Sequence, residues 1–416
     1  MSIDMKMAWR NIWRNPRRTL LTVLAIAFAC VLLIFMLSFQ FGSYATMINS
    51  SVRIHTGHLQ IQARGYLQNR KIQWVVPDPE AVGRMLDRIP AVKAYTLRAN
   101  AFALVSSAER TYGVMVTGID PDREARVSTL VHTIQQGSYL SDQPAGDGMP
   151  GALIGRLLAR NLKVTVGDEL TLLGQGRDGS VAATVLKVRG IFASGQDAMD
   201  RSTIQMPLKA FQSVFSMAGA VHEVVVMGRN LADVPDIKAA IARKLPAIPG
   251  DPPLVVLDWT QLMPGLQQAI HMDLISGAVF YLILIMVVAF SILNTFLMSI
   301  LERTHEFGIM MAMGAKPGRL TRLVLAESVS MTLVGILTGV VTGCLVTGYF
   351  MVHGLDLGAS SEILRQFGIP SLFYPRLTPL TATAGPAAVF VITLLAALYP
   401  ALRIRRLQPV EAIGHA

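Results

Sequence analysis

Four long runs with at most one charged residue each dominate the distribution of hydrophobic and polar positions along the 416-residue chain. About 20 consecutive apolar residues are enough to cross a bilayer as a helix. We therefore predict transmembrane helices over residues 19–41, 274–300, 323–350 and 377–402. The uncharged but more polar residues after the first run, up to about residue 52, are expected to continue that helix beyond the membrane as a stalk.

The long segment between the first two spans, residues 53–271, has lower hydropathy and mixed strand and helix signals. Alternating or β-branched runs predict strands at 58–62, 111–119 and 223–227, and a hairpin formed by 166–173 and 183–192. Helices are expected at 151–160 and from 206 to 215. The predicted fold class is an α+β membrane protein, with one large mixed α+β domain of two subdomains inserted between transmembrane helices 1 and 2.

A short charged connection, residues 301–322, joins the second and third predicted spans and contains more basic than acidic residues. Connections rich in Lys and Arg remain on the cytoplasmic side of the membrane. This places the connection, the N-terminal residues 1–18 and the tail 403–416 in the cytoplasm. The large domain and the short loop 351–376 then lie on the outer side of the membrane.

Within this connection, residues 306–313 are predicted to form a short helix with Phe307, Met310 and Met311 on one face. Gly314 is expected to end the helix, and residues 316–318 to turn the chain. A short helix across the mouth of two spans is suited to contact a cytoplasmic partner, and an ordinary basic loop is the alternative.

Two further patterns concern the membrane itself. Trp9 and Trp13 share one face of a predicted N-terminal helix, with Arg14 among the basic residues opposite, so residues 1–18 are expected to lie on the cytoplasmic leaflet. In the third span, Gly335, Gly339 and Gly343 stand four apart, which permits close helix packing inside the chain or between two copies.

Composition supports a membrane protein with a sizeable water-facing domain, because the chain is 52% hydrophobic yet long enough for more than four spans. Its net charge of +10 gathers in the predicted cytoplasmic pieces, which indicates topology and anionic lipid headgroups rather than nucleic acid. Both cysteines, Cys30 and Cys344, fall in predicted spans, so the outer domain has no disulfide framework.

The sequence contains no phosphate-binding G-x-x-x-x-G-K-[ST] loop, no G-x-S-x-G elbow and no H-E-x-x-H zinc motif. His55 and His58 are too few for a metal site, and Asp197 and Asp200 are expected to lie in a polar loop rather than to act as an acid–base pair. Glu327 is expected at the membrane boundary, near a helix end. No cofactor is predicted to bind the chain directly.

The connection also resembles a known family. Nine residues match the conserved connection of the FtsX/MacB/LolC–LolE permeases, the four-span (type VII) ABC transporter subunits: Glu302, Arg303, Glu306, Phe307, Gly308, Ile309, Ala312, Gly314 and Ala315. Tyr399-Pro400-Ala401, followed by Pro409-Val410-Glu411-Ala412, is similar to the family's C-terminal signature. The resemblance implies that the connection is a coupling helix seated in a groove of an ATPase subunit. The residues that it assigns to coupling are Glu302, Arg303, Glu306, Phe307, Gly308, Met310, Ala312, Gly314, Ala315 and Lys316.

The resemblance further implies a partnership of two permease subunits, identical or different, with two cytoplasmic ATPase subunits that bind ATP and Mg²⁺. A periplasmic carrier or adaptor and membrane lipids are the other partners that it suggests. The expected function is mechanotransmission to a substrate outside the membrane, most closely the lipoprotein release of LolC and LolE. The LolC-type subunit carries a proline-flanked hook that catches the carrier. The corresponding turn here, residues 173–180, is short and has no proline, so the chain is expected to be LolE-like.

Two alternatives stay open at this point. One is export of another amphiphile, such as a lipid, drug or peptide. The other is FtsX-like activation of a periplasmic cell-wall hydrolase, in which the chain would move nothing. Neither would make the chain itself an enzyme.

Overall fold

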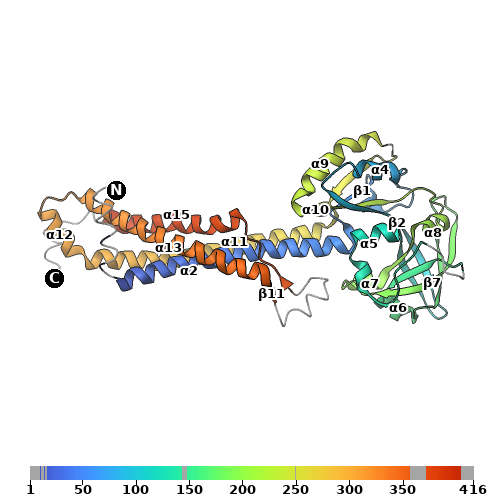
Figure 1. The fold of residues 1–416 in the computed structure, drawn as a ribbon, viewed down its shortest axis with the longest axis horizontal. Helices are drawn as coiled ribbons and strands as arrows, with labels where there is room; N and C mark the ends of the chain where they lie inside the picture. Colours follow the sequence, from blue (N-terminus) through green and yellow to red (C-terminus); the bar gives the residue numbers. More distant parts are fainter. Residues whose placement is uncertain are drawn as a thin grey trace. The chain divides into compact units, whose positions relative to one another are not determined.

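The computed structural model describes residues 10, 14, 16–142, 148–248, 250–356 and 372–403, which divide into two compact units (Figure 1). Of these residues, unit 1 takes those up to Tyr44, from Ile270 to Asp356 and from Leu372 onwards, and unit 2 takes Ala45 to Ala269.

Unit 1 is built from long helices. Their bounds are α2 (Pro16–Ser51), α11 (Pro264–Glu302), α13 (Pro317–His353) and α15 (Pro379–Arg403), with the short α12 (Thr304–Ala312) between α11 and α13. Two of them, α2 and α11, also have a few residues in unit 2. Each long helix begins at a proline, whose missing N–H costs nothing in the first turn of a helix. β11 (Leu355–Asp356) and β12 (Leu372–Phe373) form a small antiparallel pair. The four long helices are each long and apolar enough to cross a membrane.

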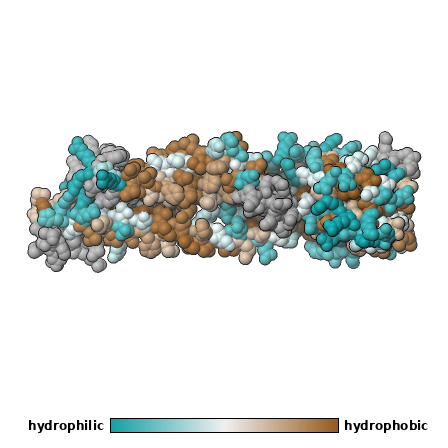
Figure 2. All heavy atoms as spheres, turned by 90° about the horizontal axis from the view of Figure 1, so that it is seen from below, coloured by the Kyte–Doolittle hydropathy of each residue, from teal (hydrophilic) through white to brown (hydrophobic). Residues whose placement is uncertain are grey.

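The helices of unit 1 are hydrophobic inside and outside. Ile26 of α2, Phe296 of α11 and Val389 of α15 belong to a shared buried core. Phe28 and Phe280 nevertheless expose more than half of their surface. In Figure 2 hydrophobic residues cover this unit over a broad band, and hydrophilic residues gather at the end that carries α12. A water-soluble bundle does not expose so much contiguous apolar surface, so the band fits contact with lipid.

Unit 2 contains one ten-stranded sheet. The strands are β1 (Leu59–Ala63), β2 (Val92–Ser106), β3 (Thr111–Ile119), β4 (Ile134–Gly137), β5 (Gly151–Gly155), β6 (Glu169–Gln175), β7 (Val181–Phe192), β8 (Thr203–Pro207), β9 (Glu223–Gly228) and β10 (Leu254–Asp258). Their order is β10-β1-β9-β2-β3-β8-β5-β7-β4, and β6 pairs with both β2 and β7. The sheet packs on a large apolar core with helices around it.

The helices of unit 2 are short. They are the π-helix η1 (Val52–Thr56), α3 (Tyr66–Asn69), α4 (Pro79–Leu86), α5 (Pro121–Val127), α6 (Arg156–Leu162), α7 (Asp197–Ser202), α8 (Leu208–Val214), α9 (Val234–Lys244) and α10 (Trp259–Leu262), with the 3₁₀ turns η2 (Leu130–Thr133), η3 (Leu231–Asp233) and η4 (Leu245–Ala247). Asp78, Asp120 and Asp258 cap α4, α5 and α10 by accepting hydrogen bonds from the first-turn amides, a role that short carboxylates fill well.

Strand β2 is the longest strand and joins the two halves of the sheet. Its first half pairs with β9 as far as the Arg98–Glu223 row, and its second half, from the Arg98–Ile119 row onwards, pairs with β3. Beyond β9, the same edge of β2 pairs with β6 from Ala103. One continuous strand, β2, thus connects the two halves of the sheet within residues 45–269, and the two subdomains stay a prediction.

Several predicted strands are confirmed, among them the strand at 111–119 and the hairpin of β6 and β7, which closes at the Gln175–Val181 row. The helix predicted at 151–160 is half wrong, because residues 151–155 form β5 and only the rest is α6. A short apolar run does not distinguish strand from buried helix. Here the strand is selected by pairing with β7 and β8, which bury Leu153 and Ile154. Likewise, the helix expected from residue 206 begins at Leu208, after β8.

Candidate functional site

The connection between α11 and α13 folds back on the helices of unit 1. Helix α12 buries Phe307 and Met311 against Ile300, Leu320 and Ala401. Met310 is partly buried against the same cluster. The apolar face recognised in the sequence is therefore used inside the chain, and it fixes the short helix to the ends of the long ones.

A turn then leads into the next helix. Met313 caps α12, and Gly314 has a φ of +93°, a conformation that side chains with a Cβ rarely adopt. The amides of Gly314 and Ala315 donate to the carbonyls of Met311 and Met310, which closes the end of the helix. Lys316 precedes the first turn of α13.

A chain of charges links α12 to α13 and to the N-terminal segment. Arg303 Nη1 donates to Glu327 Oε2 at 2.9 Å, and its Nε donates to Glu306 Oε2 at 3.3 Å. The guanidinium of Arg14 pairs with the other oxygen of Glu306. The hydrogen bond from Arg14, together with the charges of both arginines, lowers the pKa of the Glu306 carboxyl below its ordinary value. Arg303 also stacks over the Phe307 ring, 5.3 Å from its centroid.

Glu327, which the sequence predicts at the membrane boundary near a helix end, is only 6% exposed. It is buried because Arg303, 24 residues earlier in the chain, reaches it across the turn. Periodicity along one helix carries no information about a partner supplied by another element, so this pair could not be predicted from the sequence.

The residues assigned to coupling divide into two groups. Phe307 and Gly308 are buried, and Arg303, Glu306, Met310 and Ala315 are partly buried. Glu302, Ala312, Gly314 and Lys316 are exposed. The exposed face also includes His305 and two apolar side chains outside the assigned set, Ile309 at 43% and Met313 at 76% exposure. This face is the part of α12 that a partner can touch.

Of the predicted interfacial anchor, Trp9 and Trp13 lie outside the described residues. Arg14 is described, and its exposed side chain pairs with Glu306. It therefore contacts α12 rather than standing alone on the surface.

The glycine stripe of α13 lies against α2. A Cβ on Gly335 would come within 2.8 Å of Ile26, and one on Gly339 within 2.7 Å of Cys30 Cβ and of the Ala27 carbonyl oxygen. Gly343 approaches Val31 and Ile34 less closely. The stripe is filled by a helix of the same chain, so it is not available to a second copy.

The candidate metal and acid–base residues of unit 2 have structural partners. His58 Nδ1 accepts from the Gly228 amide at 3.1 Å. Asp200 is buried and accepts from the amide and hydroxyl of Ser194 at 2.8 and 2.6 Å, whereas Asp197 is exposed. Among the described residues, no three His, Cys, Asp or Glu side chains gather in the way that a metal ion requires.

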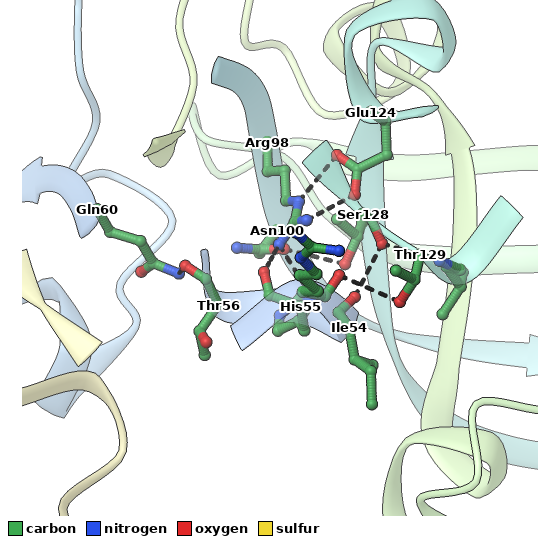
Figure 3. A network of polar contacts seen from close by, with 12 residues as sticks. Ile54, His55, Thr56, Gln60, Arg98, Asn100, Glu124, Ser128 and Thr129 are labelled. Atoms are coloured by element: carbon green, nitrogen blue, oxygen red, sulfur yellow. Dashed lines mark hydrogen bonds and ion pairs between the residues drawn. The ribbon is translucent and has the colours of Figure 1, made fainter. Parts of the chain in front are cut away.

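A buried polar network that the sequence did not reveal lies where β2, α5 and η1 meet (Figure 3). Arg98 donates to both oxygens of Glu124, from Nε at 3.0 Å and from Nη2 at 2.5 Å, and both side chains are 1% exposed. The remaining nitrogen of Arg98 donates to the backbone carbonyl of His55. This network ties β2, α5 and η1 together.

Two family models match the chain. The MacB-like periplasmic core domain matches residues 19–244, and the FtsX-like permease C-terminal model matches residues 278–409. Together they account for most of the described residues of both units.

Individual proteins agree with these models. The chain is 26% identical over 321 residues to the lipoprotein-releasing system transmembrane protein LolC of Xylella fastidiosa, covering 74% of each protein. It is 25% identical over 415 residues to the macrolide export ATP-binding/permease protein MacB of Rhodospirillum rubrum, covering 99% of this chain and 60% of that protein. The crystal structure of the periplasmic region of MacB from Actinobacillus actinomycetemcomitans matches with a TM-score of 0.38 at 12% identity, over 54% of this chain and 98% of that one.

Proposed function

Since the chain belongs to the FtsX/MacB/LolC–LolE family of ABC transporter permeases, we propose that it is the membrane subunit through which a separate ATPase does work on a substrate outside the bacterial inner membrane. ATP and Mg²⁺ would bind the ATPase, because this chain has no phosphate-binding loop. Both termini and α12 would face the cytoplasm, and unit 2 the periplasm.

The observation that carries this proposal is the exposed face of α12. Ile309 and Met313 give it an apolar centre, and Lys316 lies at its edge. Exposed apolar side chains on a short helix at the hydrophilic end of unit 1 suit a groove on a cytoplasmic protein. The buried face and the Arg303–Glu327 pair would carry displacement of α12 into α13.

The transmembrane helices are suited to transmit movement across the membrane rather than to let a substrate pass through a polar tunnel between them. A polar pathway needs ionisable groups along the spans. In the described part of α13, Glu327 is the one acidic residue, and it is already paired with Arg303. Helix α11 buries few residues in the single chain, which leaves surface for lipid and for a second permease subunit.

We propose lipoprotein release as the activity, in line with the LolC relative. The turn between β6 and β7 is a short one, from Gly176 to Ser180, and contains no proline, so a LolE-like role is proposed rather than that of the carrier-catching subunit. Export of another amphiphile is the second candidate, favoured by the MacB relative that aligns with 99% of this chain. FtsX-like hydrolase activation is the third, and the C-terminal family model favours it no more than the others.

The first experiment is purification of the tagged chain from native membranes, with mass spectrometry of the associated proteins. An ATPase and acylated lipoproteins are expected, and ATP should then release a lipoprotein from proteoliposomes that contain the purified complex. A cell-wall hydrolase in place of lipoproteins would contradict lipoprotein release, and absence of any ATPase would contradict the proposal as a whole.

The docking face is tested separately. Ile309→Asp together with Met313→Asp should abolish ATPase co-purification without changing the thermal unfolding temperature, because both side chains are exposed. Leu173→Asp is the matched control, since Leu173 is exposed to a similar degree in unit 2. Retention of the ATPase by the double variant would show that α12 is not the docking site.

A further inference from the structure

Unit 2 contains an open pocket of about 430 Å³ whose floor is one face of the sheet. Side chains two residues apart on a strand share a face, and so do residues opposite each other in register. Asn100 of β2 lies opposite Thr117 of β3, and Phe102 lies opposite Met115. These four line the pocket together with Glu223 of β9 and residues of α7.

The pocket opens where β2 changes partners. Pairing with β9 stops at the Arg98–Glu223 row, and pairing with β6 begins only at Ala103. In the gap, the Asn100 amide donates to the side chain of His222, Nδ1, at 2.8 Å instead of to a strand. The sheet is thus interrupted on one edge at the point where the pocket forms.

Glu223 is the unusual residue in this pocket. It is 8% exposed, and its Oε2 has no hydrogen-bond partner. Arg98 stands directly opposite in register, but Glu124 already holds that guanidinium with two hydrogen bonds. Burial raises the pKa of the Glu223 carboxyl above its ordinary value. A buried acceptor without a partner is costly and is rare in folded proteins, so this one calls for a missing donor.

The pocket wall combines polar and apolar side chains, and the apolar ones are Phe102, Met115, Ala198 and Met199. Phe102 exposes 70% of its surface at the rim, although it lies in a strand, and Met115 and Met199 are partly exposed beside it. Methionines adapt to irregular ligands, and an aromatic face attracts cations as well as hydrocarbon. The volume is at the lower end of the range for small-molecule sites, which suits a head group and the first part of a chain.

We propose that this pocket binds an amphiphile with a protonated amine, whose ammonium group donates to Glu223 and whose hydrocarbon chain lies on Phe102, Met115 and Met199. The proposal goes beyond the function proposed above and does not rest on it, because binding to unit 2 needs no ATPase. Arg70, an exposed residue that also lines the pocket, places a positive charge near Glu223 that opposes the binding of an ammonium group.

The test uses the full chain in nanodiscs and three probes of equal length: octylammonium, octanol and octanoate. Binding is located by the ¹³C-methyl signals of Met115 and Met199, assigned with Met115→Leu and Met199→Leu, and affinity is measured from their shifts. Octylammonium should bind more tightly than the other two. Glu223→Gln should weaken it about tenfold or more, the usual value of a charged hydrogen bond. Arg70→Gln should strengthen it, and Glu169→Gln, an exposed acid elsewhere in unit 2, should leave it unchanged.

Any of three results would overturn the proposal. These are equal affinity of the unmodified chain for the three probes, equal affinity of Glu223→Gln and the unmodified chain for octylammonium, and no change in the methyl signal of either methionine. Stronger binding of octanoate that depends on Arg70 would do so as well, since it would make the pocket an anion site. If Glu223→Gln fails to fold, Phe102→Ala replaces it, because that side chain is largely exposed. Phe102→Ala should weaken octylammonium severalfold, and an unchanged affinity would count against the site.

Discussion

Two arginines hold buried carboxylates in this chain, and they illustrate what single residues contribute. Arg98 is matched to Glu124 inside unit 2, and Arg303 to Glu327 inside unit 1. In both pairs the partners come from different elements, 26 and 24 residues apart. A buried ion pair adds little net stability over an apolar pair, but removing one partner leaves an uncompensated charge.

Arg303→Met should therefore destabilise the protein, by up to about 3 kcal/mol, because it removes a hydrogen-bonded cation from the buried carboxylate of Glu327. Glu306→Gln should cost less than about 1 kcal/mol, since that side chain is 41% exposed. Thermal unfolding of the purified variants measures both effects. Adding Glu327→Gln to Arg303→Met should recover part of the loss, and a double variant no more stable than Arg303→Met would argue against the pair.

His222 should make unit 2 sensitive to acid. Burial lowers its pKa from 6.5 to about 4. Between pH 6.5 and about pH 4, the imidazole of His222 is protonated in the unfolded chain but neutral in the folded chain. Stability should therefore be full above pH 6.5 and fall as the pH drops towards 4, by at most about 1.4 kcal/mol per pH unit.

The measurement is the unfolding temperature across this pH range for the unmodified chain and for His222→Asn. Above pH 6.5 the variant should be less stable than the unmodified chain, because it loses the contact with the Ile72 carbonyl. Its unfolding temperature should, however, fall less steeply as the pH is lowered. Glu223, with its raised pKa, acts in the opposite direction in both proteins, so the difference between them isolates the histidine. His132→Asn, at an exposed position, serves as the control and should keep the original slope.

At the scale of elements, what the sequence could predict depended on whether the signal was local. The spans followed from hydropathy, and the strand at 111–119 followed from β-branched residues. The apolar face of α12 was also visible, but not the direction in which it points, because Phe307 packs on residues from both flanking helices and from α15. The strand at 151–155 and the pairing of Glu327 depended on distant partners, which a local pattern does not contain.

The contact between α13 and α2 gives a prediction at this scale. Gly339→Ala should lower the unfolding temperature, because the new methyl group would meet Ala27 and Cys30 at 2.7 Å, an overpacking that costs about 1–3 kcal/mol. Gly348→Ala is the matched control in the same helix, where nothing lies within 4 Å. It should be neutral or slightly stabilising, since alanine favours helix. Equal effects of the two substitutions would show that the stripe is not a packing surface.

At the scale of the whole molecule, the chain combines two units of different chemistry. Unit 1 presents hydrocarbon to its surroundings, and unit 2 folds around an apolar core of its own with a largely hydrophilic surface (Figure 2). The excess of basic residues in the connection is the feature from which orientation was inferred.

Orientation can be measured with an impermeant maleimide on a chain lacking Cys30 and Cys344. Cysteine at Arg126, exposed in unit 2, should react in intact spheroplasts. Cysteine at Lys316, exposed next to α12, should react only after the membrane is permeabilised. The reverse pattern would invert the proposed topology.

Strand β2 has a mechanical consequence. A domain that closes around a bound molecule by moving two lobes together needs a hinge, usually a few loop residues whose backbone angles change. Here the two halves of the sheet are connected by an extended strand whose midpoint, Arg98, is fixed by hydrogen bonds to α5 and η1. A continuous strand that is held at its midpoint in this way resists bending. A push delivered to this domain should therefore displace the sheet as a whole rather than bend it at Arg98.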